Sequence, residues 1–236
     1  MKGLLILFGE SFRTGGQDSR IRGRDESYPE QIKAAESHMA FIEDLKNKDC
    51  HIDVYISSYT TKFDNDLTKI YANNLIQSDY NVQMTGPHDL LHRPIKNIKN
   101  IEIYDFVLFM RIDIYLKDEF KKIFNTKWDK ILFPAICFKP WHKVGNHPKV
   151  NDMMIYVPKK YFNYIQHIFY RYGGHKLWQH LNDTTDLKYD DLDTMLNTYH
   201  DSNTEKDFNP IYYIVNRPQS EVFHTEGEIF DKYNFT

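Results

Sequence analysis

The 236-residue sequence is short of cysteine, of basic charge and of long apolar runs, and each shortage excludes a class of protein. Two cysteines, Cys50 and Cys137, are too few for a disulfide framework, although one disulfide between them stays open. A formal net charge of -3 gives no sign of nucleic-acid binding. No apolar run approaches the ~20 residues that span a bilayer. We therefore expect a soluble protein of a reducing compartment, the cytoplasm.

Recognisable leader and nucleotide-binding motifs are also missing. The apolar stretch near the N-terminus has about six residues and runs into Gly9 and Glu10 without a small-residue cleavage pattern, so we do not expect a signal peptide. The chain has neither a P-loop motif nor the Gly-rich dinucleotide fingerprint after its first strand. Residues 13–24 hold four arginines and three glycines, which fits either a phosphate cradle or a solvated surface loop.

What is present is an alternation of apolar strands and amphipathic helices, typical of a mostly parallel sheet with helices on both faces. A capping box of Ser27 and Glu30, with Pro29 in the first turn, predicts the start of the first helix. Strands are expected at 3–9, 51–59, 81–86, 105–113, 130–136, 152–158, 210–216 and 221–227. Helices are expected after residue 27 and at 64–75, 94–104, 117–124, 158–181 and 189–199.

No linker or repeat divides the chain, so we expect one α/β domain over residues 1–236. The regular part, 1–116, is of a nucleotide-binding type, and 117–236 is the less regular acceptor-side half. Open parallel sheets bind ligands at the carboxyl ends of their strands. The residues that follow the predicted strands include hydroxyls, aromatics, cations and a carboxylate, which suits a nucleotide with a phosphate tail; they are 9–13, 57–61, Arg111, Asp113 and 139–142.

Arg111 and Asp113 interrupt an otherwise apolar strand near its end. A buried carboxylate is costly unless it is paired or binds a metal. Two interpretations stay open at this point. The two side chains lie two residues apart and form an ion pair with each other or with neighbours. Alternatively, Asp113 faces a crevice and holds a divalent cation against a diphosphate, while Arg111 contacts the phosphates or orients Asp113.

An apolar strand ending in an acidic motif, halfway along such a domain, resembles GT-A-type glycosyltransferases, whose usual motif is Asp-x-Asp. Here Arg111 replaces the first Asp, which puts metal dependence in question. The chain also resembles small glycosyltransferases of large DNA viruses that build capsid glycans, in residues 4–13, 31–45, 53–61, 109–117 and 199–217. The resemblance implies transfer of a sugar from a nucleotide sugar, UDP-linked and with UDP-xylose as one candidate, to a glycan on a viral glycoprotein in the host cytoplasm.

The same resemblance implies roles for individual residues, each with a structural alternative. The nucleotide would meet Gly9, Glu10, Ser11, Arg13 and Thr60 at the ends of the first two strands, and Arg111, Asp113, His200, Asn209 and Arg217 near the diphosphate. A manganese or magnesium ion would use Asp113 and His224. The acceptor's general base would be Asp152 or Asp191. The alternatives are a Glu10–Arg13 ion pair, turn residues at Thr60 and Asp152, a helix cap at Asp191, and ordinary strand residues at Arg217 and His224.

Two other functions stay open. A non-catalytic carbohydrate-binding module would use the tyrosines and tryptophans equally well. A metal-dependent phosphohydrolase or nucleotidyltransferase would need several carboxylates close together at strand ends, and only one strand offers an obvious one. The expected partners are a nucleotide-sugar donor and a glycan acceptor, without nucleic acid or a membrane span.

Overall fold

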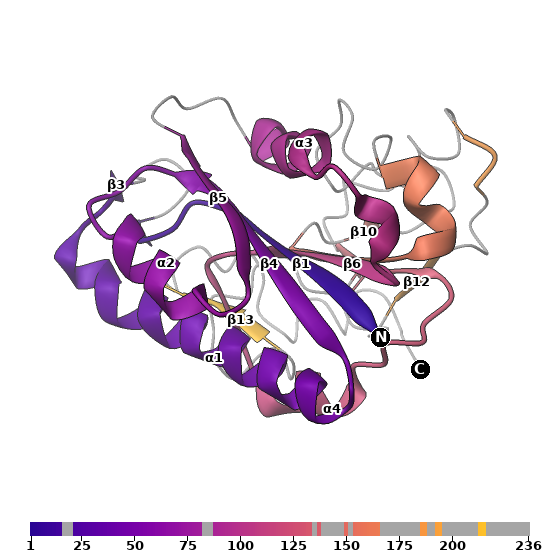
Figure 1. Cartoon of the computed structure of the whole chain (residues 1–236). Helices are drawn as coiled ribbons and strands as arrows, with labels where there is room; N and C mark the ends of the chain where they lie inside the picture. Colours follow the sequence, from indigo (N-terminus) through magenta and orange to yellow (C-terminus); the bar gives the residue numbers. More distant parts are fainter. Residues whose placement is uncertain are drawn as a thin grey trace, which may run out of the picture.

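The computed structural model describes residues 1–15, 21–81, 87–133, 136–137, 149–150, 153–165, 185–187, 192–194 and 212–215. Its centre is a seven-stranded sheet with the order β12-β8-β11-β6-β1-β4-β5 (Figure 1). The strands are β1 (Lys2–Gly9), β4 (His51–Tyr59), β5 (Leu75–Asn81), β6 (Phe106–Arg111), β8 (Ile131–Phe133), β11 (Met154–Pro158) and β12 (Leu192–Thr194). Neighbours from β6 to β5 are parallel, as are β8 and β12, whereas β11 is antiparallel to both of its neighbours. The predicted mostly parallel sheet is confirmed.

Helices cover both faces of this sheet, as predicted (Figure 1). One face packs against α1 (Tyr28–Asn47), α2 (Asp64–Tyr71) and α4 (Asp118–Ile123), which contribute buried side chains such as Phe41, Leu67 and Phe120. The other face packs against α3 (Pro87–Asn97) and the 3-10 helix η4 (Lys159–Tyr164), with Leu90 and Phe162. Two further 3-10 turns, η1 (Asp25–Ser27) and η2 (Ile101–Ile103), precede α1 and β6.

The interior strand β1 supplies side chains to both cores because successive residues of a strand point to opposite faces. Leu5 and Leu7 belong to the core on the α1 side, and Leu4 and Ile6 to the core on the α3 side. At its beginning, a Cβ on Gly3 would lie 2.3 Å from Cζ of Phe106, so only glycine lets that ring pack against the strand. Tight packing on both faces makes β1 the rigid centre of the sheet.

In the described part of the chain, three short antiparallel pairs lie outside the main sheet. They are β2 (Arg13–Thr14) with β3 (Ile21–Arg22), β7 (Ile114–Leu116) with β13 (Tyr212–Ile214), and β9 (Ile136–Cys137) with β10 (Lys149–Val150). The first two pairs directly follow the ends of β1 and β6, so short strands shape the chain just beyond the sheet. Among the described residues, no helix is long and apolar enough to cross a bilayer.

Several element predictions are wrong in detail. The capping box does not form: Ser27 has the helical φ of -82° and ψ of -15°, its side chain caps no N–H of α1, and its hydroxyl faces the carbonyls of Arg24 at 2.6 Å and Phe12 at 2.9 Å. Of the strand expected at 81–86, Asn81 ends β5 and the rest lies outside the described residues; β5 starts at Leu75, the last residue of the helix expected at 64–75, and pairing with β4 accounts for this extended backbone. The helix expected at 94–104 is α3, which starts earlier and contains Pro94.

Two further corrections concern the C-terminal half and the cysteines. Within the helix expected at 189–199, Leu192–Thr194 form β12, because parallel pairing with β8 overrides the local helical pattern. Of the long helix expected at 158–181, residues 159–164 form a 3-10 helix and those from 166 lie outside the described residues. Cys50 is a buried free thiol, so it forms no disulfide, and burial raises its pKa.

Candidate functional site

The carboxyl ends of β4, β1 and β6 lie at the same edge of the sheet. In the strand register Gly9 pairs with Ser58 of β4, and Phe8 pairs with Arg111 of β6. The residues after these positions therefore come together, as predicted. This is the edge at which open α/β sheets bind ligands.

The chain leaves β1 through Gly9, whose φ of +113° is rarely adopted by residues with a side chain. Just beyond it, the Ser58 hydroxyl donates to the Gly9 carbonyl at 2.8 Å and accepts the Ser11 N–H at 3.3 Å. Because the single Ser58 hydrogen points to Gly9, the Ser11 hydroxyl is the donor in their 3.0 Å contact. Both serines are fully buried, so Ser11 anchors this turn to β4.

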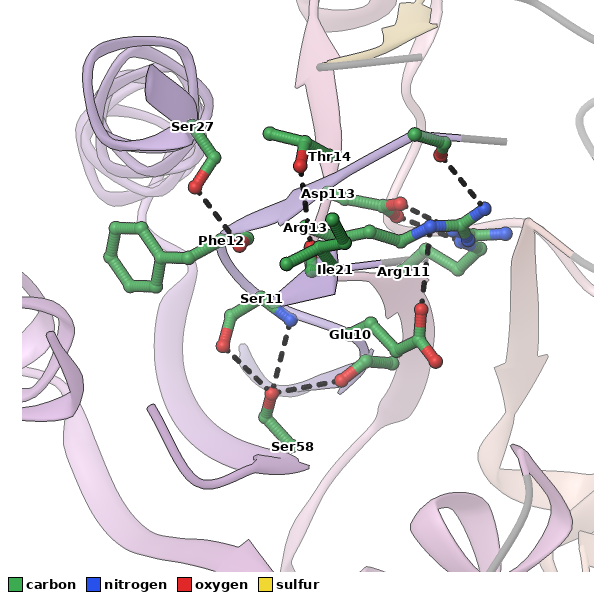
Figure 2. Close-up of polar contacts among 12 residues, drawn as sticks. Glu10, Ser11, Phe12, Arg13, Thr14, Ile21, Ser27, Ser58, Arg111 and Asp113 are labelled. Atoms are coloured by element: carbon green, nitrogen blue, oxygen red, sulfur yellow. Dashed lines mark hydrogen bonds and ion pairs between the residues drawn. The ribbon is translucent and has the colours of Figure 1, made fainter. Parts of the chain in front are cut away.

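Glu10 and Arg13 form an ion pair beside this turn, with Nε of Arg13 3.4 Å from Oε2 of Glu10. The Arg13 guanidinium also donates to the Gly15 carbonyl at 3.3 Å (Figure 2). Both side chains are at least 91% buried, whereas sequence reasoning offered a surface pair as the alternative to nucleotide binding. Burial of a guanidinium needs such partners, because an isolated charge away from water is costly.

Arg111 and Asp113 form a second pair at the end of β6 (Figure 2). Nε of Arg111 donates to Oδ1 of Asp113 at 2.8 Å, and its Nη2 donates to Oδ2, so the contact is bidentate. The Asp113 side chain is 3% exposed and that of Arg111 is 16% exposed. The structure therefore contains the ion pair that was one of the two interpretations of this motif, and Arg111 covers the Asp113 carboxylate.

Helix α1 holds the turns after β1 and β6 together through a buried amide. Gln31 accepts the Phe12 N–H at 3.1 Å and donates to the Ile112 carbonyl at 2.8 Å. Phe12 has a φ of 49°, which is uncommon without glycine, and its carbonyl accepts the Gly23 N–H at 2.9 Å and lies 2.9 Å from the Ser27 hydroxyl. These bonds stabilise the strained turn that carries Glu10 and Arg13.

Farther along α1, Ser37 and His38 bind the segment after Asp113. The Ser37 hydroxyl accepts the Leu116 N–H at 2.9 Å, and Nε2 of His38 lies 2.6 Å from the Ile114 carbonyl. Burial lowers the pKa of His38 to about 4, so the ring is neutral and donates through Nε2. Asp113 thus stands between two backbone segments that α1 fixes.

The described residues do not fit a divalent cation. Asp113 has both oxygens engaged by Arg111, and the neighbouring carboxylate of Glu10 is paired with Arg13. No group of three or more His, Cys, Asp and Glu side chains that could hold a metal occurs in the described part of the chain. The expected ligand His224 lies outside it. A metal role for Asp113 therefore lacks support from its surroundings.

The other predicted residues divide into two groups. Thr60 is described, and it is exposed at the end of β4. Asp152, Asp191, His200, Asn209 and Arg217, like residues 138–148, lie outside the described residues. Sequence reasoning missed Gln31 and His38, whereas Ser58 belongs to the strand-end segment 57–61 that it named. A usable signal existed for the two missed residues, since they are polar, seven residues apart and on the same face as the apolar stripe of α1.

The arginine-rich segment 13–24 is partly described and contributes one more contact. The guanidinium of Arg22 lies 4.5 Å from the ring centroid of Tyr59, at the end of β4. Such a cation–π contact connects the β2–β3 hairpin to the same sheet edge. The segment therefore brings two of its arginines, Arg13 and Arg22, to the carboxyl ends of the strands.

No protein-family model matches the sequence, and no curated protein matches it significantly. Similar solved structures include a mutant Drosophila β1,4-galactosyltransferase 7 in complex with manganese, UDP-Gal and xylobiose, with 10% identity, 91% of this chain and 70% of that chain covered, and a TM-score of 0.47. The galactosyltransferase LgtC, with donor and acceptor sugar analogs, is 12% identical over 86% of this chain and 74% of its own, with a TM-score of 0.46.

A glycosyltransferase involved in glycosylation of the major capsid of PBCV-1 is 12% identical, covers 71% of this chain and 64% of its own, and has a TM-score of 0.37. All three are glycosyltransferases, the class that the sequence resembles. Identities this low and TM-scores below 0.5 say nothing about what this chain binds or catalyses, which must come from its own site.

Proposed function

We propose that the protein is a glycosyltransferase that moves a sugar from a nucleoside diphosphate sugar to a glycan acceptor. The observation that carries the proposal is a pair of carboxylate-held arginines, the buried Arg13 and the partly buried Arg111, at the carboxyl ends of two adjacent parallel strands. A guanidinium matches the geometry of phosphate oxygens and stays charged at any working pH. This sheet edge is where a nucleotide would bind.

The reaction needs two contributions from the chain, stabilisation of the leaving diphosphate and a general base for the acceptor. The bond between the sugar carbon and the diphosphate breaks, and the electron pair leaves with the diphosphate, whose growing charge the two guanidiniums stabilise. The acceptor hydroxyl forms the new bond to the same carbon and gives its proton to a general base. Asp152 is the proposed base, with Asp191 as its rival; Asp152 directly precedes Met153, whose carbonyl accepts the Arg111 N–H at 2.9 Å.

The finer assignments belong to the same proposal. Residues 1–116 would bind the nucleotide, with Gly9, Glu10, Ser11 and Thr60 near the base and ribose, and 117–236 would bind the acceptor. The donor would be a UDP-sugar, with UDP-xylose among the candidates, and the acceptor a glycan on a viral glycoprotein. His200, Asn209 and Arg217 would contact the diphosphate. These assignments rest on the sequence resemblance.

A turnover assay tests the function directly. The protein is incubated with a panel of UDP- and GDP-sugars and oligosaccharide acceptors, and both free nucleoside diphosphate and elongated glycan are measured. We expect the two products in equal amounts for one donor, and a fall of at least tenfold when Arg111 is changed to Ala. Glycan binding without turnover of any donor would instead identify a carbohydrate-binding module. Release of inorganic phosphate without elongation would identify a phosphohydrolase.

A further inference from the structure

We infer that two guanidiniums, those of Arg13 and Arg111, take the place of a divalent cation on the donor's diphosphate, so that donor binding does not require a metal. The inference rests on the proposed function and specifies how its site neutralises charge. It starts from the observation that Arg111, which replaces the first Asp of the resembled Asp-x-Asp motif, engages both carboxylate oxygens of Asp113.

Replacing a divalent cation by two arginines keeps the net charge of the site unchanged. An Asp-x-Asp motif with one divalent cation carries a formal charge of zero, because two carboxylates offset the two positive charges. The four side chains Glu10, Arg13, Arg111 and Asp113 also sum to zero, with two carboxylates and two guanidiniums. A diphosphate would therefore meet the same net charge in a metal-bound Asp-x-Asp site and in this site. Here the positive charges belong to guanidiniums, which bind phosphate oxygens through hydrogen bonds.

The pairing geometry fixes where these donors are. Asp113 binds Arg111 through Nε and Nη2, which sets the plane of the guanidinium, and Glu10 lies 3.4 Å from Nε of Arg13. Because β1 and β6 are adjacent and in register at Phe8 and Arg111, both cations are positioned from neighbouring strand ends. The 16% exposure of Arg111 makes it the more accessible of the two.

The same geometry opposes a metal at Asp113. A cation on either carboxylate oxygen would stand within a few ångströms of the Arg111 guanidinium, and like charges at that distance repel strongly in a buried site. Binding a metal would therefore require the bidentate contact to break. In this chain, Asp113 is a positioning residue for Arg111 and not a metal ligand.

Isothermal titration with UDP, GDP and their sugars tests the inference, in EDTA and in excess manganese. We expect one of these ligands to bind wild-type protein with affinities that agree within threefold in the two conditions. Arg111→Ala should weaken binding at least tenfold in EDTA. Because that variant leaves Asp113 without its partner, the double variant Arg111→Gln/Asp113→Asn removes both charges together and should weaken binding similarly, with circular dichroism checking the fold.

Lys46→Ala is the matched control, because Lys46 forms an exposed ion pair with Glu43 in the last turn of α1, near the opposite end of the sheet. The affinity of this variant for the nucleotide should equal that of the wild type. Binding that appears only with manganese overturns the inference and leaves the glycosyltransferase proposal standing. Absence of binding by every nucleoside diphosphate and its sugars in both conditions overturns the proposed function and the inference with it.

Discussion

His38 shows at the residue scale how a titratable group is used for structure. Its ring is fully buried; Nδ1 lies 2.7 Å from the Tyr71 hydroxyl and Nε2 lies 2.6 Å from the Ile114 carbonyl. With Nε2 donating, the Tyr71 hydroxyl donates to Nδ1, and both nitrogens are satisfied only in the neutral ring. Protonation would turn the contact with Tyr71 unfavourable and place a charge in the core.

The lowered pKa of His38, about 4 against 6.5 when unfolded, makes folding stability depend on pH. Between these values the unfolded chain binds more protons, so stability falls as the pH decreases from about 6.5 to about 4. The contribution lost over this window is about 3 kcal/mol. Urea unfolding at pH 7 and pH 4.5 measures it. His38→Gln, which keeps a donor for Ile114, should show a shallower pH dependence; equal slopes for both proteins would contradict this role.

Asp113 shows what a single position in the sequence leaves open. The motif Arg111-Ile112-Asp113 allowed both an ion pair and a cation site, because alternation along a strand places both side chains on one side in either case. The fixed contacts of the neighbouring backbone decide between them. The Asp113 carbonyl accepts the Val215 N–H at 2.9 Å, and Ile112 is bonded to both Phe8 and Gln31. Each of these partners lies at least 81 residues along the chain from the residue that it contacts, so no local pattern reports these bonds.

At the element scale, α1 holds the backbone of the site in place. Its apolar residues pack on the sheet, and its buried polar residues Gln31, Ser37 and His38 bond to backbone groups after β1 and β6. The apolar periodicity predicted the helix correctly. Ser27 and Pro29 predicted its start correctly, because α1 begins at Tyr28, although no side-chain capping hydrogen bond forms at Ser27.

Gln31→Ala should lower the free energy of unfolding by about 2–3 kcal/mol, since a buried N–H of Phe12 and the carbonyl of Ile112 lose their partner. The same variant should weaken nucleotide binding, because the turn carrying Arg13 is released. Denaturant unfolding and titration calorimetry measure the two effects. Lys33→Ala, which changes an exposed ion pair with Glu30 on the same helix, serves as the control and should stay within ~0.5 kcal/mol of wild type. Equal stability of the two variants would show that the hydrogen bonds of Gln31 do not stabilise these turns.

At the scale of the whole molecule, the sheet separates the two large hydrophobic cores of the described residues, and both cores pack on β1. Ile6 and Leu7 are adjacent and fully buried, yet Ile6 lies in the core on the α3 side and Leu7 in the core on the α1 side. Since both cores are built on β1, we expect them to unfold together. The site lies at the end of this strand and depends on both.

Ile6→Ala and Leu7→Ala should each lower the free energy of unfolding by about 2–5 kcal/mol through the cavity left behind. Each variant should show one transition, with circular dichroism and tryptophan fluorescence giving the same midpoint. Ile76→Ala on edge strand β5, where Ile76 is 47% exposed, is the control and should change stability little. Two separate transitions, or a variant whose midpoint shifts by one probe and not by the other, would show that the two cores unfold independently.

By itself, the sequence determined the class of fold and the end of the sheet at which polar residues gather. Apolar runs and helical periodicity are local properties, and parallel strands place their carboxyl ends together wherever they pair. Only the tertiary structure decided that Arg111 encloses Asp113, that Glu10 and Arg13 are buried, and that Leu192–Thr194 form a strand. Burial, ion pairing and strand pairing depend on segments far away in the chain, and these contacts exist only once the chain has folded.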